Sequence, residues 1–83
     1  MALRFFHLRG VDEVLDQTGC EVDGLDIVRS TALRAARDVM SGDVREGKLD
    51  LRLRIDVETQ DGAVIYSLPF ARAISLFKNA EAA

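Results

Sequence analysis

Residues 23–47, DGLDIVRSTALRAARDVMSGDVREG, decide the fold, because no other segment is long and periodic enough to form a full helix. Apolar residues recur in it at the i, i+3, i+4 and i+7 spacing of a helix that lies on a core, which predicts that the helix covers a sheet. Asp23 is expected to cap the first turn, and Gly47 suits the left-handed position that follows a helix. The apolar stripe consists of Leu25, Val28, Ala32, Ala35, Ala36 and Val39.

A second apolar seam widens the apolar arc of this helix. Leu33, Met40 and Val44 lie about 80–140° around the helix axis from the centre of the first stripe, at about 100° per residue. A wide apolar arc needs a second packing partner, which is either another element of this chain or another chain.

The period changes after the helix to strict alternation of apolar and charged residues over 50–58, which predicts a strand with one buried face. Asp61-Gly62 is a favoured two-residue hairpin loop, and residues 63–68 form the return strand, which Pro69 ends. The register set by this loop pairs each large apolar residue with another: Leu53 with Phe70, Ile55 with Leu68, and Val57 with Tyr66.

The chain before the helix predicts two further strands. Residues 3–9 form the first, with Phe6 and Leu8 facing the core and Phe5 on the opposite face. Residues 11–15 are expected to return as a short second strand, followed by turn-forming residues at 16–19.

The end of the chain completes the expected fold. Residues 70–77 have the spacing of a short C-terminal helix, and residues 78–83 are expected to be a frayed tail. The order strand, strand, helix, strand, strand, short helix predicts an α+β fold in a single domain over residues 1–83. In this fold a small antiparallel sheet carries the long helix on one face.

The composition excludes several classes of function. The hydrophobic fraction is 48% and the net charge is −3, which is ordinary for a globular protein and argues against a nucleic-acid binder. A single cysteine cannot form an internal disulfide, and no Cys or His pair has metal-ligand spacing. The N-terminus lacks the apolar run of a signal peptide or membrane anchor, so we expect a cytoplasmic protein.

The order of several short motifs resembles a family of short, uncharacterised proteobacterial proteins that is catalogued as a domain of unknown function. The resemblance spans about residues 4–77 and departs from the family at Gly10-Val11, where Asp-Gly is expected after the first strand. It implies this fold and a bacterial setting, and it supplies no catalytic residues. The motifs are Arg4-Phe5-Phe6-His7-Leu8-Arg9, Asp16-Gln17-Thr18-Gly19-Cys20-Glu21, Leu33-Arg34-Ala35-Ala36-Arg37, Asp61-Gly62 and Leu68-Pro69-Phe70.

Candidate catalytic residues are few. Cys20 and His7 are the only residues of their types, and they form a thiolate–imidazolium pair if the first strand lies beside the segment before the helix. The alternative is a small buried or half-buried thiol and a strand histidine at a sheet edge or face, and no third residue orients such a pair. No metal-binding loop, phosphate-binding loop or cofactor motif is present, so we expect no catalysis, no metal, no cofactor and no small-molecule ligand.

Two surfaces remain as candidates for binding. Lys48, Arg52 and Arg54 are candidate contacts for nucleic acid or another anionic partner, although Asp50, Asp56 and Glu58 on the same strand offset their charge. The surplus of apolar residues points instead to a homodimer or a protein partner, because one helix and a small sheet cannot cover all of them. The candidate interaction surface consists of Phe5, Leu33, Met40, Val44, Ile74 and Phe77.

Overall fold

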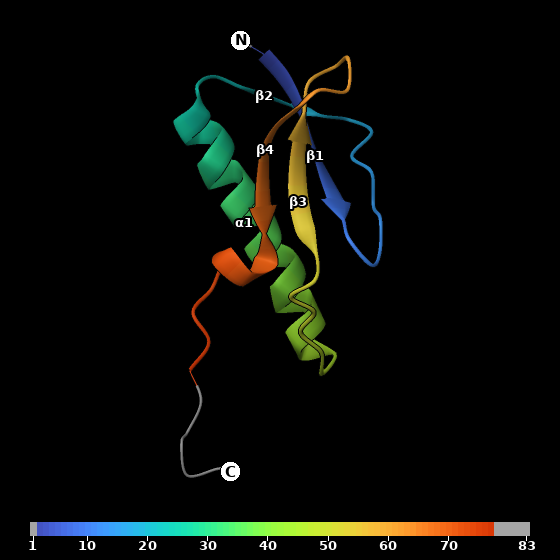
Figure 1. Ribbon diagram of the computed structural model, residues 1–83, viewed down its shortest axis with the longest axis vertical. Coiled ribbons are helices and arrows are strands. Elements are labelled where there is room, and N and C mark those ends of the chain that lie inside the picture. Colours follow the sequence, from blue (N-terminus) through green and yellow to red (C-terminus); the bar gives the residue numbers. More distant parts are fainter. Residues whose placement is uncertain (1, 78–83) are drawn as a thin grey trace.

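The computed structural model describes residues 2–77, which form a four-stranded antiparallel sheet with one long helix across one face (Figure 1). The strand order β2-β1-β3-β4 places the two halves of the chain side by side, and β1 pairs with β3 at the centre. The α+β class and the element order are therefore confirmed. The elements are β1 (Ala2–Arg9), β2 (Cys20–Val22), α1 (Leu25–Arg45), β3 (Arg54–Glu58), β4 (Val64–Pro69) and the 3-10 turn η1 (Phe70–Arg72).

Helix α1 begins one residue later than its predicted cap. Gly24 occupies the N-cap position with φ 80°, and its carbonyl oxygen accepts the Val28 N–H at 3.2 Å. The prediction that Asp23 caps the helix is wrong, because the chain enters through a left-handed glycine that leaves Asp23 one residue outside. At the other end Gly47 has φ 85°, as predicted, and donates its N–H to the Val44 oxygen.

The core lies between α1 and the sheet strands β3 and β4. Four helix residues spaced i, i+4 are buried there, namely Val28, Ala32, Ala36 and Met40. This line is rotated from the predicted stripe, because Met40 joins the core while Leu25 is half exposed. Two alanines in the line let the helix lie close to the sheet. The other buried core residues, from the strands and the chain next to them, include Leu53, Ile55, Val57, Leu68 and Phe70.

The hairpin of β3 and β4 has the predicted register and a different loop. Ile55 pairs with Leu68 and Val57 with Tyr66, but Thr59, not Gln60, closes the loop on Ala63. The loop thus has three residues ending in Gly62 at φ 89°, which is typical of a turn followed by a glycine bulge. This loop shifts the pairing by one residue, and the predicted pairing of Val57 with Tyr66 is restored because Ile65 bulges out of the ladder. Strand β3 also begins at Arg54, so the predicted strand residues 50–53 form the connection before it.

The second strand lies in a different place from the predicted one. Of residues 11–15 only Val14 joins the sheet, through an isolated bridge to Leu8. The chain then leaves the ladder and returns as β2, where Cys20 pairs with Arg4. The physical reason is Asp16, whose carboxylate accepts the Phe6 N–H at 3.2 Å and takes the place of a ladder partner.

The predicted C-terminal helix over residues 70–77 is wrong, because the chain forms only the 3-10 turn η1. Phe70 is completely buried and donates its N–H to the Leu53 oxygen at 3.0 Å, which turns the chain back onto the core. Arg37 Nε then donates to the Ala73 oxygen at 2.9 Å and fixes the residue after the turn. The predicted frayed tail, residues 78–83, lies outside the described residues.

Candidate functional site

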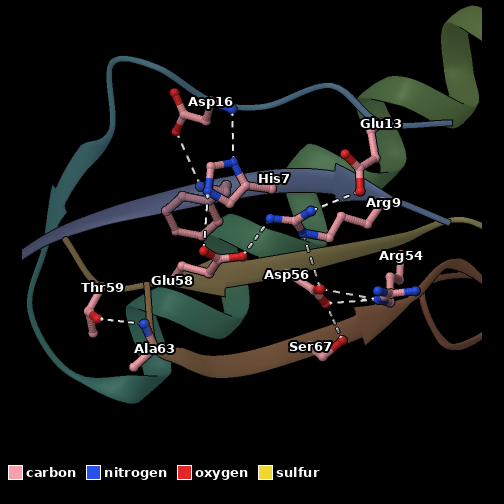
Figure 2. Close-up of polar contacts among 11 residues, drawn as sticks. His7, Arg9, Glu13, Asp16, Arg54, Asp56, Glu58, Thr59, Ala63 and Ser67 are labelled. Atoms are coloured by element: carbon pink, nitrogen blue, oxygen red, sulfur yellow. Dashed lines mark hydrogen bonds and ion pairs between the residues drawn. The ribbon is translucent and has the colours of Figure 1, made fainter. Parts of the chain in front are cut away.

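The face of the sheet opposite α1 carries a network of charged side chains from three strands (Figure 2). Alternation along paired antiparallel strands aims them all at the same side, since His7 pairs with Asp56 and Asp56 with Ser67. We call this cluster the outer network. Its members are His7, Arg9, Glu13, Asp16, Arg54, Asp56, Glu58 and Ser67.

Arg9 is the hub of the outer network. Its Nη1 lies 2.9 Å from Glu13 Oε2, its Nη2 2.9 Å from Glu58 Oε2 and its Nε 3.6 Å from Asp56 Oδ2. The hydrogen bond to Glu58, more than that to Glu13, raises the pKa of Arg9, although desolvation opposes the rise. Arg9 therefore ties β1 to β3 and to the loop at residues 10–19.

Asp56 is the buried anion of the network, with 6% of its surface exposed. Its Oδ1 accepts the Ser67 hydroxyl at 2.6 Å and Arg54 Nε at 3.1 Å. A buried carboxylate is tolerated only when donors surround it. Ser67 on β4, Arg54 on β3 and Arg9 on β1 supply these donors. We find no buried side-chain nitrogen or oxygen without a partner among residues 2–77.

Asp16 fastens the loop at residues 10–19 over β1 (Figure 2). Burial opposes ionisation of its carboxylate, but the N–H groups of Gly19, Phe6 and Thr18 donate to it and hold the pKa of Asp16 below its ordinary value. The Asp16 N–H donates in turn to His7 Nδ1 at 3.0 Å. The loop also lies directly on β1, because a Cβ at Gly19 would be only 2.9 Å from the Leu3 side chain.

This geometry occupies the Nδ1 lone pair of His7. The lone pair of His7 Nδ1 already accepts the Asp16 N–H, so the imidazole proton is on Nε2, which faces Glu58 Oε1 at 3.7 Å. A base needs a free lone pair within reach of a substrate proton. Sequence analysis missed this network because it depends on the pairing of β1 with β3, although the alternation of His7 and Arg9 along the first strand was a usable signal.

The structure does not bring the candidate thiol and imidazole together. Cys20 pairs with Arg4, three residues from His7 along β1, so the two side chains lie on opposite faces of the sheet. Cys20 is also exposed, which contradicts the expectation of a buried thiol.

The candidate anion-binding residues are spread out and partly neutralised. Arg52 makes a two-pronged ion pair with Asp50, at 3.0 Å from Nε and 2.9 Å from Nη2, and this pairing lowers the pKa of Asp50 and raises that of Arg52. Arg54 is engaged by Asp56. Lys48 makes no side-chain hydrogen bond or ion pair within residues 2–77, although its charge also helps to lower the pKa of Asp50.

Three of the six predicted interaction residues meet at one place. Met40, Val44 and Ile74 line an open hollow of about 420 Å³, whose other lining residues come from the end of α1 and the connection after it. Val44 is 56% exposed and Leu49 37%, so the wall of the hollow is apolar and open to water. We call it the α1 hollow. Its lining residues are Arg37, Met40, Ser41, Val44, Arg45, Leu49 and Ile74.

The other three predicted interaction residues do not line this hollow. Phe5 is partly buried under the loop at residues 10–19, and its ring stacks on His7 with centroids 6.2 Å apart. Leu33 is partly buried against the core. Phe77 is 90% exposed beyond the turn.

Residues 2–77 contain neither a cluster of metal ligands nor a membrane-spanning helix. Histidine, cysteine, aspartate and glutamate side chains do not gather there in threes around a point where a metal could sit. The one α-helix of this range is too polar to cross a lipid bilayer.

Comparison with known proteins gives a family and no activity. We found no similar protein among curated sequences and no similar solved structure. One family model, described as Domain of unknown function (DUF6894), matches residues 5–71, which run from within β1 into η1 and include the whole of β2, α1, β3 and β4. The match covers well over half of the 83 residues, and the chain therefore belongs to the DUF6894 family.

Proposed function

We propose that this chain is a non-catalytic interaction module that docks a second copy of itself or another protein at the α1 hollow. The observation that carries the proposal is the exposure of Val44 and Leu49 on the wall of a largely apolar hollow. Soluble proteins seldom leave contiguous apolar surface uncovered unless it binds something. Ile74 from the far end of the chain extends the same apolar surface.

The sheet edges support the hollow as the docking place, because both edges are poor templates for another strand. Strand β2 is only three residues long. Strand β4 is interrupted by the bulge at Ile65 and ends in Pro69, which has no N–H to donate. Short edges, bulges and prolines are the usual protection against edge-to-edge pairing. An association through the sheet edges is therefore disfavoured.

The outer network supports the non-catalytic part of the proposal. Its carboxylates and arginines are engaged with one another, and His7 has no free lone pair on Nδ1. Nucleic acid is the weaker alternative, because Arg52 and Arg54 already have carboxylate partners.

Site-specific photocrosslinking tests the proposal inside the cell. A benzophenone amino acid replaces Val44 in one variant and Ile27 in a second, which is 49% exposed near the other end of α1 and serves as the matched control. We expect irradiation to give discrete adducts from position 44 and none from position 27. Light scattering of the purified protein then tells whether the adduct is a second copy.

The proposal fails if neither position gives an adduct, or if both give the same adducts at the same yield. Val44→Glu provides an independent check, because it puts a charge on the wall of the hollow at an exposed site. It should remove any dimer mass seen by light scattering and any adduct from a second crosslinker at Leu49, while the fold remains intact by circular dichroism. Met40→Glu is unsuitable for this purpose, since Met40 is buried and the variant would test folding.

A further inference from the structure

The α1 hollow has an electrostatic character opposite to that of the whole chain. Two of its lining residues, Arg37 and Arg45, are cationic and none is acidic, whereas the chain has a net charge of −3. Arg37 uses Nε for the Ala73 oxygen, which leaves its two Nη groups directed elsewhere without a partner among residues 2–77. The Arg45 side chain makes no ion pair or hydrogen bond within the same range.

The charges and the apolar wall are arranged in parallel rows. Arg37, Ser41 and Arg45 are four residues apart and form one row along α1, with Met40 and Val44 in the next row. Leu49 and Ile74 face this helix surface from the other two segments that line the hollow. An occupant that satisfies both rows must present a large apolar group with negative charge beside it.

A second copy of this chain fits that requirement poorly. A twofold dimer that buries this hollow at its axis would set the cationic hollow against its own copy. Like charges facing each other across an interface oppose association. A small molecule also fits poorly, because sites for small ligands enclose most of the ligand, whereas Val44 and Leu49 leave the hollow open.

We infer that the α1 hollow binds an acidic segment of a different protein, in which a large apolar side chain is flanked by Asp or Glu. This inference rests on the proposed function and specifies its partner. The apolar side chain lies against Val44, Leu49 and Ile74, and the carboxylates pair with the free Nη groups of Arg37 and with Arg45. Arginine suits this role because its planar fork matches a carboxylate.

A displayed library of random peptides provides the probe. It is selected against the wild-type protein at low salt, and the selected peptides are synthesised and titrated against three variants. Arg45→Glu reverses a charge on the wall of the hollow, and Val44→Glu disrupts its apolar wall. Arg34→Glu is the matched control, because it makes the same charge reversal at an exposed position of α1 outside the hollow.

We expect the selected peptides to be enriched in Asp and Glu next to Leu, Ile, Phe or Trp, although the net charge of the protein repels acidic peptides. Their affinity should fall at least about tenfold with Arg45→Glu, remain within about twofold with Arg34→Glu, and weaken with added salt, because surface ion pairs are screened. Selection against Arg45→Glu should yield less acidic peptides.

The other outcomes separate this inference from the proposed function. Peptides that need Val44 but bind Arg45→Glu equally well would overturn the acidic partner and retain the docking function. Failure to select any peptide whose binding depends on Val44 would overturn both. A dimer mass that Val44→Glu removes would identify a second copy as the occupant. Displacement of the peptides by micromolar decanoate would identify an amphiphilic small molecule, and either result would overturn the inference.

Discussion

The outer network and the α1 hollow use the same residue type in opposite ways. In the outer network Arg9 is held by Glu58, Glu13 and Asp56, so its charge is consumed in joining β1, β3 and the loop above them. At the α1 hollow Arg45 has no partner within residues 2–77. The first region is closed by its own contacts, and the second presents apolar surface and charge to water. The comparison indicates that a surface of this protein can bind a partner where its charged and apolar side chains have no partner within the chain.

The largest expected effect concerns the core that supports the hollow. Phe70 is completely buried, and η1 positions the following segment that carries Ile74 into the hollow. Phe70→Ala should reduce the free energy of unfolding by about 3–5 kcal/mol, measured by urea denaturation, because it removes a large buried ring and leaves a cavity. A loss below about 1 kcal/mol would mean that the hollow is not built on a packed core.

The next test removes the buried anion of the closed region. Asp56→Ala leaves the Ser67 hydroxyl and Arg54 without their acceptor, so we expect a loss of about 1–3 kcal/mol in the same assay. Ser67→Ala is the control, and it should cost less because Asp56 retains its arginine. If Asp56→Ala leaves the free energy of unfolding unchanged, the outer network behaves as a solvated surface and the contrast with the hollow disappears.

The pH dependence of the free energy of unfolding tests whether the charge of Asp16 holds the loop at residues 10–19. Its carboxylate accepts three backbone N–H groups, so Asp16→Asn should cost about 1–2 kcal/mol at neutral pH. The pKa of Asp16 is lowered in the folded state, so its contribution is present above the unfolded value of about 3.9 and is lost as pH falls through the folded pKa. The gap in free energy of unfolding between wild type and variant should be constant above about pH 5 and should narrow below about pH 4.

The control for this series is Asp38→Asn, at an exposed carboxylate on α1. Its free energy of unfolding should stay within about 0.5 kcal/mol of the wild-type value at neutral pH, as for other exposed surface substitutions. A gap for Asp16→Asn that persists unchanged into acid would show that the amide replaces the carboxylate fully, and that the charge of Asp16 does not hold the loop.

The smallest effect on stability is expected in the open region. Val44→Glu should change the free energy of unfolding by no more than about 0.5 kcal/mol, because the side chain is already exposed. The same variant should abolish docking at the hollow, measured with the peptides selected above. A large loss of stability would instead place Val44 in the core and remove the distinction between the two regions.

Local patterns predicted much of this fold. The length of α1 follows from its periodicity and from Gly47, and the pairing of Ile55 with Leu68 follows from two matched apolar rows. Both depend on residues close together in the sequence, where spacing alone carries the information. The α1 hollow was half predicted for the same reason, because Met40 and Val44 share a seam, while Leu49 was not considered.

The parts that were not predicted depend on contacts between distant segments. The pairing of β1 with β3 brings Arg9 to Glu58 across almost fifty residues, and no local pattern signals it. Likewise Asp16 was expected to act in a turn, and it does so through Thr18, but its bond to the Phe6 N–H also moves the second strand to residues 20–22. A single side chain that replaces a strand as hydrogen-bond partner leaves no periodic pattern in the sequence.

The bulge at Ile65 has a consequence for how the length of this chain can vary. The three-residue loop shifts the ladder by one position, and the bulge shifts it back before Val57 meets Tyr66. The extra residue in the loop and the extra residue in the strand thus compensate each other in this hairpin. A double deletion of Gln60 and Ile65 should accordingly remove both the third loop residue and the bulge, leaving the Asp61-Gly62 two-residue loop with Ile55 against Leu68.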